Sequence, residues 1–154
     1  MKKFMNHSFC ALFLFISFAA QANDITIIDP WVRAAPPNAP ALAAFMQIEN
    51  HSGNAVSIVE VRTSLAIDHT ELHRTQMKDG VMKMIPQQVI PVAAGSNTIL
   101  KPGSWHIMLI KPVEVPAIGD MVELTLVFDD GVEKTIRAHV RKGMKMMGSG
   151  HDHN

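Results

Sequence analysis

The feature that most constrains the fold is the alternation of apolar and polar residues within short segments bounded by turn-forming residues. In residues 121–128 every second residue is a large apolar one (Val122, Leu124, Leu126 and Phe128), and Glu123, Thr125 and Val127 lie between them, as in a strand with one face in a core. Lys78-Asp79-Gly80 and Asp129-Asp130-Gly131 are hairpin signals. Turn signals roughly every 8–12 residues predict an all-β sandwich or barrel without a helix of useful length. We expect strands in residues 24–29, 43–50, 55–63, 70–77, 80–85, 96–101, 105–110, 121–128 and 132–140.

Residues 1–22 are predicted to be a cleaved secretory signal. Two lysines open the chain, an apolar stretch covers Phe9–Ala20, and Ala20-Gln21-Ala22 is an A-x-A cleavage site. The apolar stretch is shorter than the roughly 20 residues that span a bilayer, so a retained anchor is the weaker alternative. Cys10 follows Phe9 inside this stretch, where a lipoprotein signal has a small residue. We expect export to the periplasm with no membrane span after cleavage.

Removal of the signal changes the composition. The chain loses its one cysteine and two of its 14 basic residues, so 12 basic residues face 14 acidic ones, a net charge of −2 with histidine neutral. This balance, without a block of like charge, argues against a nucleic-acid partner and against an electrostatic membrane anchor. Nine methionines and seven histidines in the remaining 132 residues are the unusual feature that a function must explain.

The stretch Lys101–Ile110 places an imidazole and a thioether side by side. Pro102-Gly103 gives way to a predicted strand in which His106 and Met108 are two residues apart, so their side chains share one face. Packing is one explanation of this pair, and a soft metal ion is the other.

A second pair follows from the predicted hairpin. If Asp79 and Gly80 are the central residues of a two-residue turn, the register puts Met84 opposite Thr75. His73 shares the face of Thr75, so His73 and Met84 become diagonal neighbours about 7–8 Å apart. A slip of one residue would put Met84 on the wrong face. If the strand of the first pair comes near, two imidazoles and two thioethers converge.

Such a set of ligands favours Cu(I). Thioether sulfur is soft and uncharged, which suits Cu(I) and makes it a poor ligand for zinc, magnesium or calcium. Outside the cytoplasm a pair of cysteines is liable to oxidise, whereas methionine and histidine avoid that reaction. Because the exported chain has no cysteine, it cannot form a blue-copper electron-transfer site, which requires a thiolate.

The motif His73-x10-Met84-x21-His106-x-Met108 resembles the H-x10-M-x21-H-x-M pattern of the periplasmic copper chaperone family written PCu(A)C. The stretches WVRAAPP, MQIEN, ELH, DGVMKM and LKPGSWHIMLI agree with that family as well. The likeness covers residues 25–128, and its four-residue spacing is specific.

The resemblance implies a cupredoxin-like Greek-key β-sandwich or barrel with one exposed Cu(I) held by those four side chains. It implies a carrier without catalytic activity that delivers copper to the binuclear copper-A centre of cytochrome c oxidase. Oxidase subunit II or a thioredoxin-like copper-A assembly protein would be the acceptor. One departure is Gly103-Ser104-Trp105, where the family commonly has Gly-Gly before the aromatic residue. Trp105 and Trp31 are expected to be hydrophobic anchors, with a Trp105 lid over the copper as the alternative.

The chain is predicted to divide into a copper-binding domain over 23–142 and a flexible tail over 143–154. The tail resembles Met/His extensions of some family members, where a second copper site is proposed. Its histidines would favour Cu(II) and its methionines Cu(I), and a disordered end with chance ligands is the alternative. The candidate ligands of the tail are Met144, Met146, Met147, His151 and His153.

The other methionines and histidines have simpler expected roles. Met46 and Met121 lie in apolar strand patterns, so we expect them to pack. Met77 and Met82 are expected to face each other on the side away from His73. The remaining histidines are expected to be solvated or without a partner (His51, His69 and His139).

Three rival functions stay open on the sequence. A copper redox enzyme would use more imidazole and an open position for oxygen, and two thioethers argue against it by favouring Cu(I). A metal-free secreted interaction module would gain no stability from copper. A periplasmic copper buffer or resistance protein differs from a chaperone in its partner alone.

Overall fold

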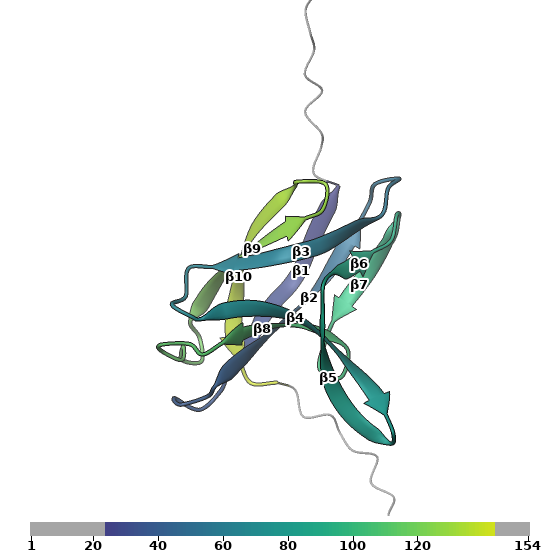
Figure 1. Ribbon diagram of the computed structural model, residues 1–154. Coiled ribbons are helices and arrows are strands. Elements are labelled where there is room, and N and C mark those ends of the chain that lie inside the picture. The colour runs from purple at the N-terminus through teal and green to yellow at the C-terminus, as the bar shows by residue number, and fades with distance from the viewer. Residues whose placement is uncertain (1–23, 144–154) are drawn as a thin grey trace, which may run out of the picture.

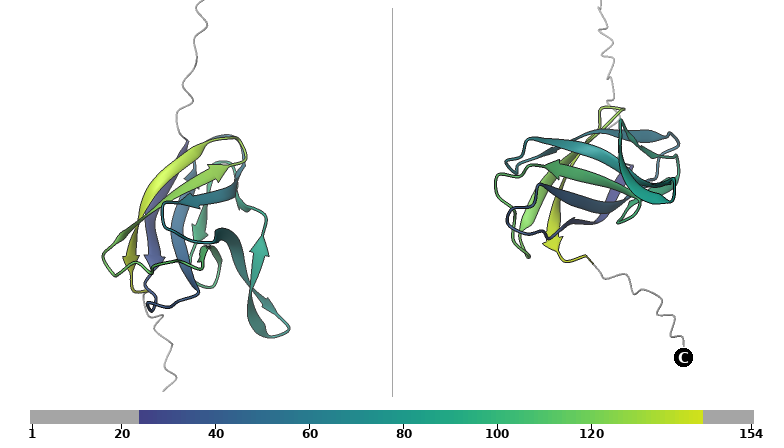
Figure 2. Two further views of the ribbon diagram at one scale, coloured as in Figure 1. Left: turned by 60° about the vertical axis from the view of Figure 1, so that its left-hand side comes forward. Right: turned by 60° about the horizontal axis from the view of Figure 1, so that its bottom comes forward.

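The computed structural model describes residues 24–143, which form ten β-strands in one curled sheet (Figures 1 and 2). The signal and all of the tail after Gly143 lie outside these residues. Within the described part no helix has the length and apolarity needed to cross a bilayer. The all-β prediction is confirmed. The strands are β1 (Ile25–Arg33), β2 (Ala41–Asn50), β3 (Val56–Thr63), β4 (His69–Lys78), β5 (Val81–Gln87), β6 (Ile90–Val92), β7 (Ser96–Leu100), β8 (Trp105–Ile110), β9 (Met121–Phe128) and β10 (Glu133–Arg141).

The sheet closes on itself into a barrel-like body. Its strand order is β5-β4-β8-β7-β2-β1-β10-β9-β3-β6, with β8 also paired to β2. Two hydroxyl groups join strands that are distant in this order. Thr70 Oγ1 on β4 donates to the Val61 carbonyl on β3 at 2.6 Å, and Thr98 Oγ1 on β7 donates to the Pro91 carbonyl on β6 at 2.7 Å. The ends of the sheet therefore lie against one another, and barrels of this kind leave few open edges.

The core follows the predicted alternation. On β9 the side chains of Val122, Leu124, Leu126 and Phe128 are all buried, while Glu123 is exposed. These residues meet apolar side chains from the inner faces of the other strands in one cluster, which supplies most of the stability of such a domain.

Both predicted hairpins are present. Asp79 and Gly80 have φ angles of 54° and 75°, the left-handed pair that a type I′ turn requires. The turn sets the predicted register, in which Lys78 lies opposite Val81. The second hairpin joins β9 and β10, and Gly131 takes its positive-φ position.

Two details escaped the sequence pattern. Strand β1 continues past Pro30 to Arg33 because a bulge between Ile28 and Trp31, with Asp29 at a φ of 47°, takes up the irregularity. Strand β6 has three residues with Pro91 in the middle, a composition that indicates a loop. It lies at the end of the strand order, where proline is tolerated.

We expect Leu124→Ala to lower the free energy of unfolding by about 2–5 kcal/mol, because it leaves a cavity in the centre of the core. Val113→Ala is the matched control, since that side chain is 83% exposed. Chemical denaturation of both variants measures the difference. Equal losses in the two variants would contradict this placement of the core.

Candidate metal centre

Strand β8 has one face in the core and one face toward a pocket. Ile107 and Leu109 are fully buried members of the apolar cluster. His106 and Met108 alternate with them, and both line the pocket instead. The predicted strand therefore presents its imidazole and its thioether on the same outer face.

The pairing of β8 with β4 brings the two histidines together. His73 lies directly opposite His106 in the antiparallel ladder. Their rings stand edge to face, with centroids 5.5 Å apart and an interplanar angle of 62°. On the other side of β4, Met84 lies opposite Thr75, as the hairpin register predicted.

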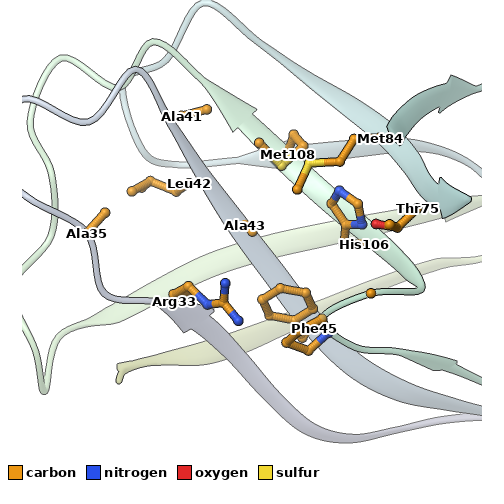
Figure 3. Close-up of a pocket in the computed structure, with 12 residues that line it drawn as sticks. Arg33, Ala35, Ala41, Leu42, Ala43, Phe45, Thr75, Met84, His106 and Met108 are labelled. Atoms are coloured by element: carbon orange, nitrogen blue, oxygen red, sulfur yellow. The ribbon is translucent and has the colours of Figure 1, made fainter. Parts of the chain in front are cut away.

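The pocket collects both thioethers beside His106. Figure 3 shows Met84, Met108 and Thr75 grouped around the His106 ring. Small side chains on β2 make the room, since Ala43 is the direct cross-strand partner of Met108. His73 is not among the residues that line the pocket, and it lies next to His106 on the neighbouring strand β4. The four side chains that the sequence singled out therefore lie on one side of the β5-β4-β8 sheet.

Burial divides the four candidate ligands into two kinds. The His106 residue is 2% exposed and the His73 side chain 12% exposed. Met108 is half-buried, and Met84 is 63% exposed. The nitrogens are thus held inside the protein, while one sulfur faces the solvent.

Each histidine has one ring nitrogen committed to a hydrogen bond. His106 Nδ1 donates to the Ser104 carbonyl at 3.0 Å, and His73 Nε2 donates to Glu71 Oε2 at 2.7 Å. Carbonyl and carboxylate oxygens accept only, so these contacts fix the tautomers of the neutral rings. The lone pairs are left on His106 Nε2 and His73 Nδ1. Both atoms are buried without a hydrogen-bond partner among the described residues, which is costly unless a ligand occupies them.

The turn before β8 holds His106 in place. Gly103 has a φ of 80°, which glycine adopts without strain. The Ser104 carbonyl accepts hydrogen bonds from two donors, the His106 ring and the Thr75 backbone N–H, the latter at 3.0 Å. One oxygen thereby links the ring orientation of His106 to the position of β4.

Burial favours the neutral form of the His106 ring. Burial lowers the pKa of His106, and the nearby His73 and Arg33 lower it further against the Ser104 hydrogen bond, which raises it. Hydrogen bonds from His69 and then His73 lower the pKa of Glu71, so that carboxylate stays ionised.

Glu71 is a residue that the sequence reasoning missed as part of the site. It accepts hydrogen bonds from His73 and from His69 Nε2 at 2.9 Å. In the ladder between β4 and β8 it lies opposite Met108. A carboxylate on the far nitrogen of a ligating histidine orients the ring and raises its basicity. The signal was present in the i, i+2 spacing of Glu71 and His73.

An aromatic and cationic wall borders the pocket. Phe45 on β2 stacks on Trp31 with centroids 4.6 Å apart and lies 6.3 Å from the His106 ring. The Arg33 guanidinium lies 5.5 Å from the Phe45 centroid. Trp105 does not line the pocket. It packs against the core, and the Arg74 guanidinium lies over its ring. It is an anchor as predicted, and the alternative of a Trp105 lid is wrong because alternate residues of β8 face opposite ways.

One expectation about the hairpin methionines is wrong. Met77 and Met82 face each other, as predicted, and both are exposed. The ladder from Leu72 to Lys78 has no bulge, however, so alternation puts Met77 on the face of His73 rather than away from it. Met46 packs in the core as expected, and Met121 is half-buried.

The remaining histidines do not join the candidate site. His51 is exposed beside Glu49, and His69 is exposed but bonded to Glu71 and Asp68. His139 lies on β10 opposite Trp31 and Met121. The five candidate ligands of the tail lie outside the described residues.

The arrangement can act as a soft metal centre. Two neutral imidazole nitrogens and two uncharged thioethers make a donor set that suits a monovalent ion such as Cu(I). With both rings in the neutral form, the lone pairs on His106 Nε2 and His73 Nδ1 are available to an ion.

Solved structures with this fold are PCuAC domains. The copper-bound PCuAC domain from PmoF2 superposes with a TM-score of 0.66 at 22% identity, over 78% of this chain and 94% of that domain. The Cu(I) form of DR1885 from Deinococcus radiodurans superposes with a TM-score of 0.61 at 30% identity, over 81% of this chain and 83% of that protein. The all-β fold is thus that of a PCuAC domain.

The chain belongs to the LpqE-like family of predicted lipoproteins, which matches residues 25–140 and hence nearly all of the ten strands. One relative, a predicted lipoprotein of Leifsonia xyli subsp. xyli, is 32% identical over 122 residues, which is 79% of this chain and 72% of that protein.

As the pH rises, we expect His106 in the metal-free protein to lose its ring proton before His69. Burial keeps the pKa of His106 below 6.5, and the hydrogen bond to Glu71 raises that of His69 above it. At pH 6.5 His106 should be mostly neutral and His69 mostly protonated. A two-dimensional ¹⁵N NMR titration measures both, and simultaneous titration of the two rings would contradict the expectation.

Proposed function

We propose that this protein is a copper carrier that binds one Cu(I) through His73 Nδ1, His106 Nε2 and the sulfurs of Met84 and Met108. The observation that carries the proposal is the pair of buried ring nitrogens, on His106 and His73, that have no hydrogen-bond partner within residues 24–143. His106 shares its pocket with both thioethers. The likeness to DR1885, which has been solved with Cu(I), supports the choice of metal. The copper-bound domain from PmoF2 supports it as well.

The contrast between the buried ring nitrogens and the exposed Met84 sulfur suits a protein that passes its copper on rather than one that stores it. The buried nitrogens define where the ion sits, and the exposed Met84 gives an incoming ligand access to it. A single Cu–thioether bond is weak enough to be exchanged, so an acceptor replaces the ligands one at a time and no bare ion is released. The set favours Cu(I) over Cu(II) through its two soft sulfurs, which argues for a carrier rather than a redox enzyme.

The proposed acceptor is the copper-A centre of cytochrome c oxidase, reached through oxidase subunit II or a thioredoxin-like assembly protein. The support is the resemblance of the four-residue motif to the PCu(A)C chaperones. A periplasmic copper buffer is the competing function. Transfer of Cu(I) to a purified copper-A domain separates the two, because a buffer would keep its metal in the presence of that acceptor.

We further propose that the chain works in the periplasm as a released protein. Membership in a family of predicted lipoproteins agrees with export, as does the signal-like start of the sequence. The one cysteine, Cys10, is inside the apolar stretch and follows a phenylalanine, which is unsuited to lipid attachment. Cleavage behind Ala22 would leave the exported chain without a thiol.

X-ray absorption of the Cu(I)-loaded protein tests the inner ligand set. We expect two nitrogen and two sulfur neighbours in the wild type and the loss of one nitrogen neighbour in His73→Ala. Loss of a group that only hydrogen-bonds a metal ligand lowers metal affinity by about 10–100-fold. Loss of the ligand His73 itself should therefore lower the Cu(I) affinity at least as much. His51→Ala is the matched control, since that side chain is exposed and remote. An unchanged copper environment in His73→Ala would overturn the proposed site.

The tail is proposed to hold a second copper ion. The described chain ends at Gly143, where a Cβ would lie 3.1 Å from Arg33 Nε, and Arg33 lines the pocket. Gly143, the first residue of the tail, therefore lies beside a side chain that lines the pocket. The methionines and histidines that follow it in the sequence are further soft and borderline ligands.

Deletion of residues 143–154 should lower the copper bound per chain in excess Cu(I) or Cu(II), and should slow transfer to an acceptor. The absorption spectrum of the inner Cu(I) should stay unchanged, because its ligands are all in the domain. Metal analysis and stopped-flow transfer measure these effects. Unchanged stoichiometry and rate in the shortened protein would remove the tail from the mechanism.

A further inference from the structure

The end of the β4–β5 hairpin projects beyond the barrel. Strand β4 pairs with β8 only as far as Arg74, whereas its ladder with β5 continues to the turn at Asp79. Figure 1 shows this hairpin extending away from the rest of the sheet. Within residues 24–143 its end is therefore a two-stranded ribbon without a third strand or a core beneath it.

Three methionines are exposed on this ribbon. Met77 is 65% exposed, Met82 54% and Met84 63%, and none of them belongs to the hydrophobic core. The usual role of methionine as a filler of core gaps therefore does not account for them.

The register puts the three thioethers on one face. Met77 and Met82 are direct partners, and Met84 lies two residues from Met82 on the same strand. Opposed residues have Cβ atoms about 4.5–5.5 Å apart, and diagonal ones about 7–8 Å, which long side chains bridge. This is the face that carries His73 and Thr75, so the row of sulfurs leads from the hairpin tip to the inner centre.

The opposite face of the ribbon has a different chemistry. By the same alternation it carries the cationic side chains of Arg74, Lys78 and Lys83. The positive charges thus point away from the sulfurs, where they repel an incoming cation least. A ribbon with a thioether face and a cationic face is suited to binding a soft cation on one side only.

We propose that Met77, Met82 and Met84 form an outer Cu(I) site that loads the inner centre through their shared ligand, Met84. This inference rests on the proposed Cu(I)-carrier function and adds the entry route. In the transfer step a Cu–S bond to Met77 or Met82 breaks as a Cu–N bond to His106 or His73 forms. The step exchanges a neutral sulfur donor for the lone pair of a neutral ring nitrogen, so the ion stays Cu(I) and no electron moves.

The test compares Met77→Leu/Met82→Leu with the control Met121→Leu. Leucine keeps the apolar bulk on an exposed ribbon, so the fold is retained, and Met121 lies on β9, which pairs with neither β4 nor β5. We expect the double variant to take Cu(I) from a chromogenic chelator about tenfold more slowly, an effect of about 1.4 kcal/mol on the barrier. Its final inner-site stoichiometry should match that of the wild type and of the control. An unchanged loading rate would overturn the entry route, and it is the result expected if this face only docks a partner protein.

A second measurement detects the outer site itself. Ag(I) is the probe, and the ε-methyl NMR signals of Met77 and Met82 should shift when more than one equivalent is added to the wild-type protein. Methyl signals that stay in place would overturn the outer site. If the inner centre takes no Cu(I) in any variant, the proposed carrier function fails, while shifts of the Met77 and Met82 methyls would still support a metal site on the hairpin.

Discussion

The register of β8 between β4 and β2 is the constraint on which the rest of the site depends. Ile107 and Leu109 must face the core, since both are fully buried there, and this requirement turns His106 and Met108 toward the pocket. A slip of one residue would place an imidazole in the apolar interior and expose two aliphatic side chains. The free energy of core burial therefore selects which side chains of β8 face the pocket, although neither His106 nor Met108 belongs to the apolar cluster.

Local patterns predicted the strands and one half of the site well. The Asp79-Gly80 turn is a two-residue signal with one favoured geometry, and it was sufficient to place Met84 opposite Thr75. The direct pairing of His73 with His106 was beyond such reasoning. It joins strands β4 and β8, which are far apart in the sequence, and no turn between them sets their alignment.

Two features of the candidate site were missed because they depend on tertiary contacts, and one was misassigned because the alternation of side chains along a strand was not applied consistently. Glu71 matters through a hydrogen bond that exists only once the His73 ring has its orientation. The Ser104 carbonyl acquires its role by meeting β4. Met77 was assigned to the wrong face of the hairpin for a simpler reason. In a ladder without a bulge, residues two apart share a face, so Met77 had to share that of His73.

The exposure of Met84 has a chemical cost as well as a kinetic use. Peroxide and hypochlorous acid oxidise accessible methionines to the sulfoxide, which replaces a soft sulfur donor with a hard oxygen. Met84, at 63% exposure, is open to this reaction, while Met46, at 2%, is protected. If Met84 is the copper ligand proposed above, oxidation would disable metal capture without unfolding the barrel, and a methionine sulfoxide reductase would restore it.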